Sequence, residues 1–356
     1  MVGIALLGAG IFARKEHLPA IEASPALFEL KAVYSRSQAS AEALAAASRS
    51  PASVAVYFDE PAAAGKSLDD LLTRADVAAA VVALPILSQP AVVQKALAAG
   101  KHVLSEKPVA GDLAAARELV AWYTALPSAP ARPIFAVAEN FRFWPSLLYA
   151  ADELRRIGGH VATFSLKMHQ FVKPDNNYLN TPWRKTPEHQ GGFVLDGGVH
   201  FVAALRLLLG ATGHEVKQLV GFSGLLEARL PPVDTVTAVA LTRGGKTGTI
   251  AISFGTEFKA GLEVEVVTTQ GAVVWEPKKV RTFTRAAGEG DGPVEVAKTF
   301  AADSGVAAEV AAFGEAIAAG AADPRQTPEE ALKDLEILQR LLESGAGGAT
   351  LQTIQG

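Results

Sequence analysis

The chain has 356 residues and no cysteine, and this absence removes several kinds of chemistry at once. Without cysteine there are no disulfide bonds, no thiolate metal ligands and no cysteine nucleophile. Clusters of histidine and carboxylate residues at metal-ligand spacing are lacking as well, so we expect no metal ion. A composition free of disulfides fits a cytoplasmic protein.

An excess of one charge is also missing. Lys and Arg total 33 against 37 for Asp and Glu, which gives a formal net charge of -4, and no dense Lys/Arg tract occurs. Nucleic-acid-binding proteins present a basic patch or stripe. We therefore expect a small-molecule substrate rather than a nucleic acid as the partner.

Long hydrophobic runs are the third absence. The apolar stretch 2–11 has no basic segment before it and is interrupted by glycines, which is not the pattern of a signal peptide. We find no apolar stretch of the length that a membrane span needs, and so expect no membrane association. The composition, 49% hydrophobic and 20% charged, instead predicts a compact protein, and the length predicts two domains.

A glycine-rich loop follows the first apolar run. Residues 2–7 have the pattern of a buried parallel strand, and Gly-Ala-Gly-Ile-Phe-Ala comes directly after them, before a helical pattern. In a dinucleotide-binding loop, Gly8 would form the tight turn, Gly10 would let a pyrophosphate approach, and Ala13 would let the helix pack closely. A structural glycine turn is the alternative, but the position between strand and helix favours dinucleotide binding. The predicted loop residues are Gly8, Gly10, Ile11, Phe12 and Ala13.

The end of the second predicted strand, residues 28–34, bears on the choice of cofactor. Ser35, Arg36 and Ser37 follow it, where NAD-binding proteins usually offer an acidic residue to the ribose hydroxyls. Hydroxyl groups and a guanidinium suit a 2′-phosphate, which a carboxylate would repel. The sequence therefore predicts NADP(H) in preference to NAD(H). The alternative is that Arg36 is a solvated charge and Ser37 only caps the next helix.

Strand and helix patterns alternate through the first part of the chain. Strand patterns recur at residues 54–58, 77–84, 101–104 and 134–137, with helical patterns at 68–73, 90–99 and 112–126 between them. This alternation predicts a doubly wound parallel sheet. We assign residues 1–138 to a Rossmann dinucleotide-binding domain and residues 139–356 to a second α/β domain for substrate binding and oligomerisation.

The segment 103–108, Val-Leu-Ser-Glu-Lys-Pro, closes one of these strands with a charged pair and a proline. Ligands of open α/β sheets bind just past the carboxyl ends of the strands, which would place Lys107 at the ligand. Pro108 raises the frequency of a cis peptide bond, which would fix the direction of the lysine. An ordinary surface turn is the alternative.

The second half of the chain has strand patterns separated by turn signals. Residues 216–284 contain several such runs, divided by pairs such as Gly244-Gly245 and Gln270-Gly271, which argues for an antiparallel sheet. Residues 288–292 are expected to form an exposed loop. An amphipathic helix is predicted for 306–319, and Thr327-Pro328 is expected to open another.

Three polar stretches of this half are candidates for the substrate site. The strand at 134–137 ends in Glu-Asn-Phe-Arg, which nominates Asn140 and Arg142. The long loop 172–190 is of a kind that is usually functional or disordered, and Trp183 with Arg184 would border the substrate or pack at a subunit contact.

The third stretch, residues 196–209, has helical periodicity and places Asp196 and His200 on one helical face. A helix N-cap and a satisfied core histidine are the alternative roles for these two residues. The presence of Lys107 elsewhere in the chain favours a functional role for both.

In this order and spacing, the motifs resemble the glucose–fructose oxidoreductase, inositol dehydrogenase and rhizopine-catabolism (Gfo/Idh/MocA) family, and especially its NADP-dependent fungal branch. The likeness rests on residues 8–13, Leu84-Pro85, Glu106-Lys107-Pro108, Glu139-Asn140 and Gly-Gly-Phe-Val-Leu-Asp-Gly-Gly-Val-His at 191–200. Each motif is weak alone, whereas their order over nearly the whole chain is specific.

The resemblance implies a Rossmann domain followed by an α/β domain with a large, mostly antiparallel open sheet, across which homodimers or homotetramers form. It also implies that Lys107 hydrogen-bonds the reacting oxygen, that His200 donates or accepts a proton and that Asp196 supports the site. Leu84, Pro85 and Glu106 would join Lys107 at the cofactor.

Two departures from the family pattern concern the substrate pocket. The family often has Asn and His just beyond the position of Pro85, where this chain has Ile86 and Gln89, and an Asp where this chain has Ala203. The usual sugar or inositol specificity is therefore not implied.

The leading hypothesis is an NADP(H)-dependent oxidoreductase that moves a hydride between the nicotinamide and a carbonyl or secondary alcohol of an aldehyde, ketone, sugar or polyol. A non-catalytic dinucleotide sensor on the same fold is the first alternative, because fold does not fix function. A glycosidase-like enzyme that uses the cofactor transiently is the second.

Overall fold

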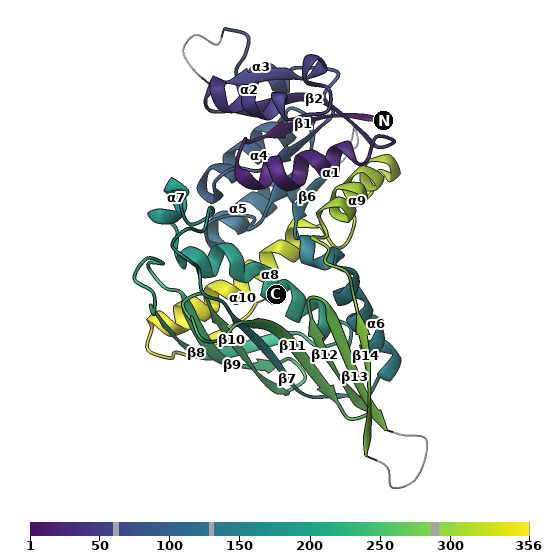
Figure 1. Cartoon of the computed structure of the whole chain (residues 1–356), viewed down its shortest axis with the longest axis vertical. Helices are drawn as coiled ribbons and strands as arrows, with labels where there is room; N and C mark the ends of the chain where they lie inside the picture. Colours follow the sequence, from purple (N-terminus) through teal and green to yellow (C-terminus); the bar gives the residue numbers. More distant parts are fainter. Residues whose placement is uncertain (60–63, 128–131, 286–291, 356) are drawn as a thin grey trace. The chain divides into compact units, whose positions relative to one another are not determined.

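The computed structural model describes residues 1–59, 64–127, 132–285 and 292–355. The chain divides into two compact units (Figure 1). The first consists of Met1–Glu139 and Val306–Leu332, and the second of Asn140–Gly305 and Lys333–Gly356.

The first unit is built on a six-stranded parallel sheet with the order β3-β2-β1-β4-β5-β6. Four consecutive residues of β1 are completely buried, as is every residue of β4, because helices cover both faces of a doubly wound sheet. The predicted Rossmann fold is confirmed. Its strands are β1 (Val2–Leu7), β2 (Phe28–Ser35), β3 (Ala55–Phe58), β4 (Ala79–Val82), β5 (His102–Glu106) and β6 (Phe135–Ala138).

The helices of this unit begin where side chains can cap them. Ser37 and Asp112 each accept a hydrogen bond from the backbone of the first turn that follows, and Ser67 forms a capping box with Asp70. The helical segments are η1 (Ala13–His17), α1 (Leu18–Glu22), α2 (Gln38–Ala46), η2 (Pro51–Ser53), α3 (Leu68–Leu72), η3 (Ile86–Ser88), α4 (Gln89–Ala98), α5 (Leu113–Thr124) and α9 (Val306–Ala319).

The position of α9 departs from the predicted division at residue 138. The chain returns to the first unit for residues 306–332, because the apolar face of α9 joins the core of that unit. Phe313 is completely buried and stacks on Phe28 at a ring distance of 6.1 Å. The domain expected to be continuous from residue 139 to 356 is therefore interrupted.

The second unit contains a nine-stranded sheet with the order β14-β13-β12-β11-β7-β10-β9-β8-β15. Only β7 and β10 pair in parallel among the described strand pairs of this sheet, so the mostly antiparallel prediction is confirmed. Its strands are β7 (Val161–His169), β8 (Val216–Gly224), β9 (Thr235–Thr242), β10 (Thr247–Ser253), β11 (Gly261–Thr268), β12 (Gly271–Glu276), β13 (Lys279–Arg285), β14 (Pro293–Thr299) and β15 (Gln352–Thr353).

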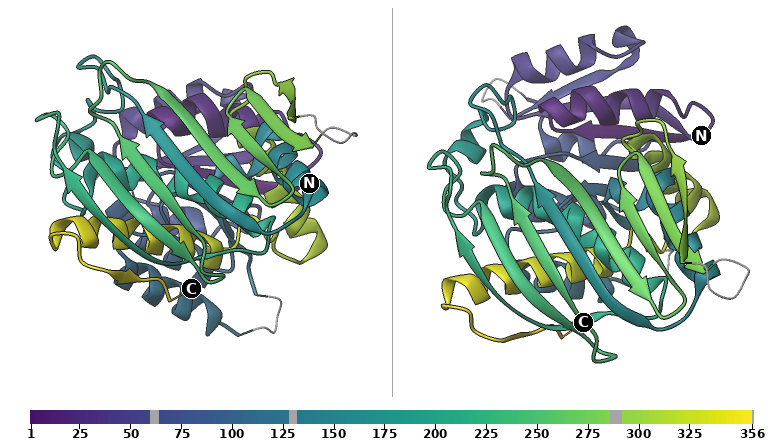
Figure 2. Two further views of the ribbon diagram at one scale, coloured as in Figure 1. Left: turned by 90° about the horizontal axis from the view of Figure 1, so that it is seen from below. Right: turned by 60° about the horizontal axis from the view of Figure 1, so that its bottom comes forward.

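Helices pack on one face of this sheet. α6 contacts β12 and β13, and α8 contacts β7, β10 and β11, while Figure 2 shows the other broad face of the sheet in front of the helices. The helical segments are η4 (Asn140–Phe143), α6 (Pro145–Ile157), α7 (Pro182–Lys185), α8 (Gly192–Gly210) and the greater part of α10 (Pro328–Ala346).

Some details of the second half differ from the sequence prediction. Strand β14 was not predicted, and all its residues are exposed, so it lacks the alternating burial on which such predictions depend. Most of the predicted loop at 288–292 lies outside the described residues. Thr327 does cap α10, since its Oγ1 accepts a hydrogen bond from the Glu330 amide at 3.3 Å.

Helix α8 corrects one expectation about membranes. With 19 residues, it is long and apolar enough to cross a bilayer, although no apolar stretch of that length was expected from the sequence. In this structure, however, 72% of its most apolar window is buried. Such burial is typical of a core helix, here the one that lies against the large sheet.

Candidate functional site

The glycine loop after β1 has the open backbone that a pyrophosphate requires. Gly8 has a φ of +113°, and a Cβ there would lie 2.1 Å from the Ala83 carbonyl oxygen, so a side chain is excluded. A Cβ on Gly10 would meet nothing within 4 Å, which leaves space beside the loop. The buried Ala13 packs in the core. These residues fit a dinucleotide.

The helix after this loop starts with an unusual turn. Residues 13–17 form a π-helical turn before α1 begins, and isolated π turns are frequent at functional sites. Ile11 and Phe12, both partly exposed, lie at its start. Leu84 and Pro85 connect β4 to η3, and the Leu84 side chain lies close to Gly8. The predicted cofactor residues of the first two motifs therefore lie together.

The residues at the end of β2 have different surroundings. Ser37 caps α2, as the alternative interpretation held, and its Oγ lies 2.9 Å from that of Ser40. Arg36 is exposed, and within the described parts of the chain it makes no hydrogen bond or ion pair. Its guanidinium is therefore available to a ligand, as is the partly exposed Ser35.

Lys107 lies in a turn directly after β5, and the peptide bond between it and Pro108 is cis, as predicted. The Gln89 side chain fastens this turn. Its Nε2 lies 3.2 Å from the carbonyl oxygen of Glu106 and 3.5 Å from that of Pro108. Gln89 is 1% exposed. The residue that departs from the family pattern thus supports the backbone on both sides of Lys107.

A second side chain that supports this turn was missed in the sequence. His17, completely buried at the end of the π turn, places its Nε2 2.6 Å from Oε1 of Glu106. Its ring also meets that of Phe12 edge to face at 5.3 Å. The only available signal was a histidine shortly after the glycine loop, because its partner lies 89 residues further along the chain.

In the second unit, Asp196 and His200 both lie on α8. The helix N-cap is Gly191, so the interpretation of Asp196 as the N-cap is wrong. His200 is half-buried and stacks on Phe141 at a ring distance of 4.7 Å. Phe141 belongs to η4, and its ring covers one face of the His200 imidazole.

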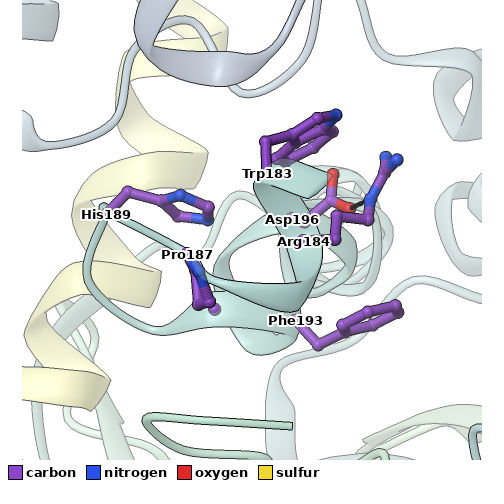
Figure 3. A pocket seen from close by; sticks show the side chains of 7 residues that line it. Trp183, Arg184, Pro187, His189, Phe193 and Asp196 are labelled. Carbon is purple, nitrogen blue, oxygen red and sulfur yellow. Dashed lines mark hydrogen bonds and ion pairs between the residues drawn. The ribbon is translucent and has the colours of Figure 1, made fainter. Parts of the chain in front are cut away.

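Arg184 joins the long loop to α8. Its Nε donates a hydrogen bond to Oδ2 of Asp196 at 2.7 Å, and its guanidinium lies 3.9 Å from the ring centre of Trp183. Figure 3 shows this ion pair between the Trp183 and Phe193 side chains. The side chains around it form a shallow pocket of about 150 Å³ that includes open solvent, and no space inside it is large enough for a water molecule. Its lining residues are Trp183, Arg184, Pro187, His189, Gly192, Phe193 and Asp196.

His189 is a further residue of this pocket that the sequence prediction missed. It is 8% exposed, and its Nε2 has no hydrogen-bond partner within the described structure. Burial lowers the pKa of His189, partly offset by the charge of Asp196. The ring is therefore neutral near pH 7, and its Nε2 is buried without a partner among the described residues.

Two predicted substrate residues are bound to protein partners instead. The Asn140 side chain donates a hydrogen bond to the Ser304 carbonyl oxygen at 2.6 Å. The Arg142 guanidinium is buried and pairs with Asp334, which Arg206 also contacts. These contacts favour a structural role, because a buried charge needs its partner.

Within the described residues, no group of three His, Asp or Glu side chains is arranged to hold a metal ion.

Two family descriptions match the chain, one over each half. Residues 2–126 match the NAD-binding Rossmann fold of the Gfo/Idh/MocA oxidoreductases, and residues 155–353 match their C-terminal α/β domain. The chain belongs to the Gfo/Idh/MocA family of oxidoreductases. The resemblance inferred from the motifs is confirmed, as is the assignment to a class of enzymes with an NAD(P)-binding fold.

Relatives within this family match the whole chain. Dehydrogenase FPY6 of Fusarium mangiferae is 50% identical over 356 residues, which is 100% of this chain and 99% of that protein. A D-xylose 1-dehydrogenase (NADP(+)) of Haloferax volcanii is 29% identical over 98% of each chain. A crystal structure of an oxidoreductase from Thermotoga maritima superimposes with a TM-score of 0.83 at 27% identity, covering 99% of this chain and 98% of that one.

Proposed function

We propose that the protein is an NADP(H)-dependent oxidoreductase that transfers a hydride between the nicotinamide and a carbonyl or secondary alcohol of a small molecule. The observation that carries this proposal is the turn at Lys107. A lysine follows the carboxyl end of a parallel strand, the edge where such sheets bind ligands. Gln89 contacts the backbone on both sides of it, so the backbone position from which the lysine side chain extends is fixed.

The bound nicotinamide supplies or accepts the hydride, and the protein handles the proton and the oxygen charge. In the reduction direction, Lys107 donates a hydrogen bond to the substrate oxygen as negative charge develops there. His200 then gives a proton to that oxygen, and in the oxidation direction it takes the proton back. Histidine suits both directions because its ordinary pKa lies near neutrality. Asp196 supports the site through its ion pair with Arg184.

The preference for NADP(H) rests on Arg36. Its exposed guanidinium has no partner among the described residues, and it stands just before α2, whose N-terminus favours negative charge. The Haloferax volcanii relative is named for NADP(+), which agrees with this proposal.

The proposed substrate class is a small aldehyde, ketone, sugar or polyol. An indole ring and the Arg184–Asp196 pair border the pocket of the second unit, and together they suit a molecule with both hydroxyl groups and apolar faces. The same relative is named for D-xylose. Because the chain lacks the family's usual residues at positions 86, 89 and 203, we propose the class and no single sugar.

We also propose a cytoplasmic homodimer or homotetramer that forms through the large sheet. Phe222 on β8 and Val239 on β9 are 69% and 50% exposed. Val239 lies opposite Val220, two residues from Phe222, so these apolar side chains share one face of the sheet. Light scattering of the purified protein, with Phe222→Lys as the variant, tests this assembly.

A substrate screen tests the proposed reaction. Aldehydes, ketones, sugars and polyols, D-xylose among them, are offered with NADPH or NADP⁺ while the absorbance of NADPH is followed. We expect turnover with at least one compound, lost in Lys107→Ala. A protein that binds NADPH, turns over no compound and changes its affinity for another protein when NADPH binds would instead be a sensor.

A further inference from the structure

The residue directly after β3, Asp59, supplies the carboxylate that is lacking after β2. The two strands pair in parallel, and the pairing ends with Ser35 opposite Phe58. Arg36 and Asp59 follow directly, one after each strand, and neighbouring strands in such sheets are about 4.8 Å apart. A carboxylate therefore lies beside the residue proposed to bind the 2′-phosphate. Left unrestrained, it would repel the phosphate or pair with Arg36.

Tyr34 and helix α3 restrain this carboxylate. The hydroxyl of Tyr34, which is 4% exposed, donates a hydrogen bond to Oδ2 of Asp59. The amide of Leu68, the first residue of α3, donates to Oδ1 at 3.4 Å. Both carboxylate oxygens thus have donors within the protein. The backbone of Tyr34 also accepts a hydrogen bond from the Gly8 amide at 2.8 Å, which places this residue next to the glycine loop.

The charges around Tyr34 show that these groups are coupled. Burial raises the pKa of Tyr34, and so does its hydrogen bond to Asp59, whereas the positive charge of Arg36 lowers it. The hydroxyl therefore remains a donor at any physiological pH. The charge of Arg36 thus affects the pKa of the same hydroxyl that donates to Asp59. Arg36 itself makes no ion pair within the described ranges.

We propose that Tyr34 determines cofactor specificity by holding the Asp59 carboxylate away from Arg36 and from the cofactor ribose. The proposal rests on the proposed preference for NADP(H). When the tyrosine hydroxyl is present, Arg36 keeps its charge for the 2′-phosphate. When it is absent, Asp59 is released at one oxygen and competes with the phosphate for Arg36.

Cofactor titrations test this proposal without any substrate. Dissociation constants for NADPH and NADH are measured by fluorescence on the full-length protein and its variants. For Tyr34→Phe we expect NADPH to bind about tenfold more weakly and NADH to change less than about twofold, as for the loss of one charge-assisted contact. The wild-type ratio of the two constants tests the NADP(H) preference itself, so the two ideas can fail separately.

The second variant, Asp59→Asn, removes the charge and keeps an acceptor for Tyr34. We expect it to bind NADPH as tightly as the wild type or up to about threefold more tightly, because no carboxylate then competes for Arg36. In the double variant Tyr34→Phe/Asp59→Asn, the ratio of constants should return to within about twofold of the wild type, as expected for directly coupled residues.

Tyr57→Phe is the matched control. Tyr57 is the register partner of Tyr34 on β3, and its hydroxyl interacts with Arg74 rather than Asp59, so its loss should leave the ratio unchanged. An equal effect of Tyr34→Phe on both cofactors, or a lower melting temperature with no change in the ratio, would reduce Tyr34 to a structural residue. Selective weakening of NADH in Asp59→Asn would show that Asp59 binds the ribose and would overturn the proposal.

Discussion

The imidazole of His17 and the carboxylate of Glu106 form a buried hydrogen bond of 2.6 Å that joins the segment after the glycine loop to the turn containing Lys107. The His17 side chain is completely buried, and that of Glu106 is 13% exposed. The predicted cofactor loop and the predicted catalytic lysine are thus connected by side chains within the first unit.

Removing the imidazole should therefore disturb both stability and turnover. In His17→Ala, Glu106 loses its partner in a nearly dry environment, which costs about 1–3 kcal/mol in the free energy of unfolding. We also expect kcat to fall, because the turn at Lys107 loses one of its two supports. Urea unfolding and steady-state kinetics measure the two effects. The exposed His160 offers a control, and an equal response of His160→Ala would contradict the prediction.

The Arg142–Asp334 ion pair predicts a large loss of stability. Arg142→Ala leaves the buried Asp334 with an incompletely compensated charge, and breaking a buried pair in this way costs about 3–5 kcal/mol. Arg155 forms an exposed pair with Asp152 on α6, and Arg155→Ala should cost at most about 1 kcal/mol. Urea unfolding compares the two variants. If Arg142→Ala instead raises KM without loss of stability, Arg142 belongs to the substrate site after all.

These two pairs join residues 89 and 192 positions apart, and they show which parts of the structure could not be predicted from local sequence patterns. Local patterns sufficed for the Rossmann strands, the loop at Gly8 and the turn at Lys107, because strand periodicity, glycine and proline act over a few residues. The role of Arg142 depends on a partner 192 residues away, and a polar residue at a strand end looks the same whether it meets a substrate or a carboxylate. The placement of α9 in the first unit could not be predicted either, because it also depends on contacts with distant residues. An apolar helix face can pack against either core.

A half-buried histidine, His102, predicts how stability depends on pH. Burial lowers the pKa of His102, whose Nδ1 accepts a hydrogen bond from the Ile134 amide at 2.9 Å, and a proton there would remove this acceptor. Below the ordinary histidine pKa of about 6.5, the unfolded chain binds a proton that the folded chain excludes. The free energy of unfolding should therefore decrease as the pH falls through 6.5.

Urea unfolding of the wild type and of His102→Asn between about pH 5 and 7.5 checks this expectation. The asparagine can offer an acceptor but binds no proton, so the slope of stability against pH should become smaller. An identical slope in the two proteins would assign the acid sensitivity to other groups, among them His169 and His189, whose pKa values burial also lowers.

The proposed preference for NADP(H) makes a prediction for Arg36. A charge-assisted contact to the 2′-phosphate contributes on the order of 1.5–3 kcal/mol, so Arg36→Ala should weaken NADPH binding about ten- to a hundredfold and leave NADH binding unchanged. Arg49, which pairs with Glu22, provides the control variant Arg49→Ala. Equal losses for both cofactors would show that Arg36 acts on the adenine or on the fold.

Variants at Lys107 and His200 distinguish the enzyme hypothesis from the hypothesis of a dinucleotide sensor. A sensor needs the glycine loop and a shaped second unit, but it has no use for a group that polarises an oxygen or for one that exchanges a proton. In the proposed mechanism the charge of Lys107 acts on the transition state, so its loss should damage turnover far more than cofactor affinity. We expect Lys107→Ala and His200→Ala each to lose at least about a hundredfold in kcat, as for other positioned acid–base groups.

Both variants should keep near-normal NADPH binding and melting temperatures, measured by fluorescence titration and thermal unfolding alongside the kinetics. Lys95→Ala is the control, since Lys95 is an exposed lysine of α4 that pairs with Asp69, and its kcat should stay within about twofold of the wild type. Unchanged turnover in both site variants on a confirmed substrate would refute the assignment. If only one variant loses turnover, another group must carry out the proton transfer or the contact to the substrate oxygen. His189 would be tested first, because its Nε2 is buried in the pocket beside Asp196.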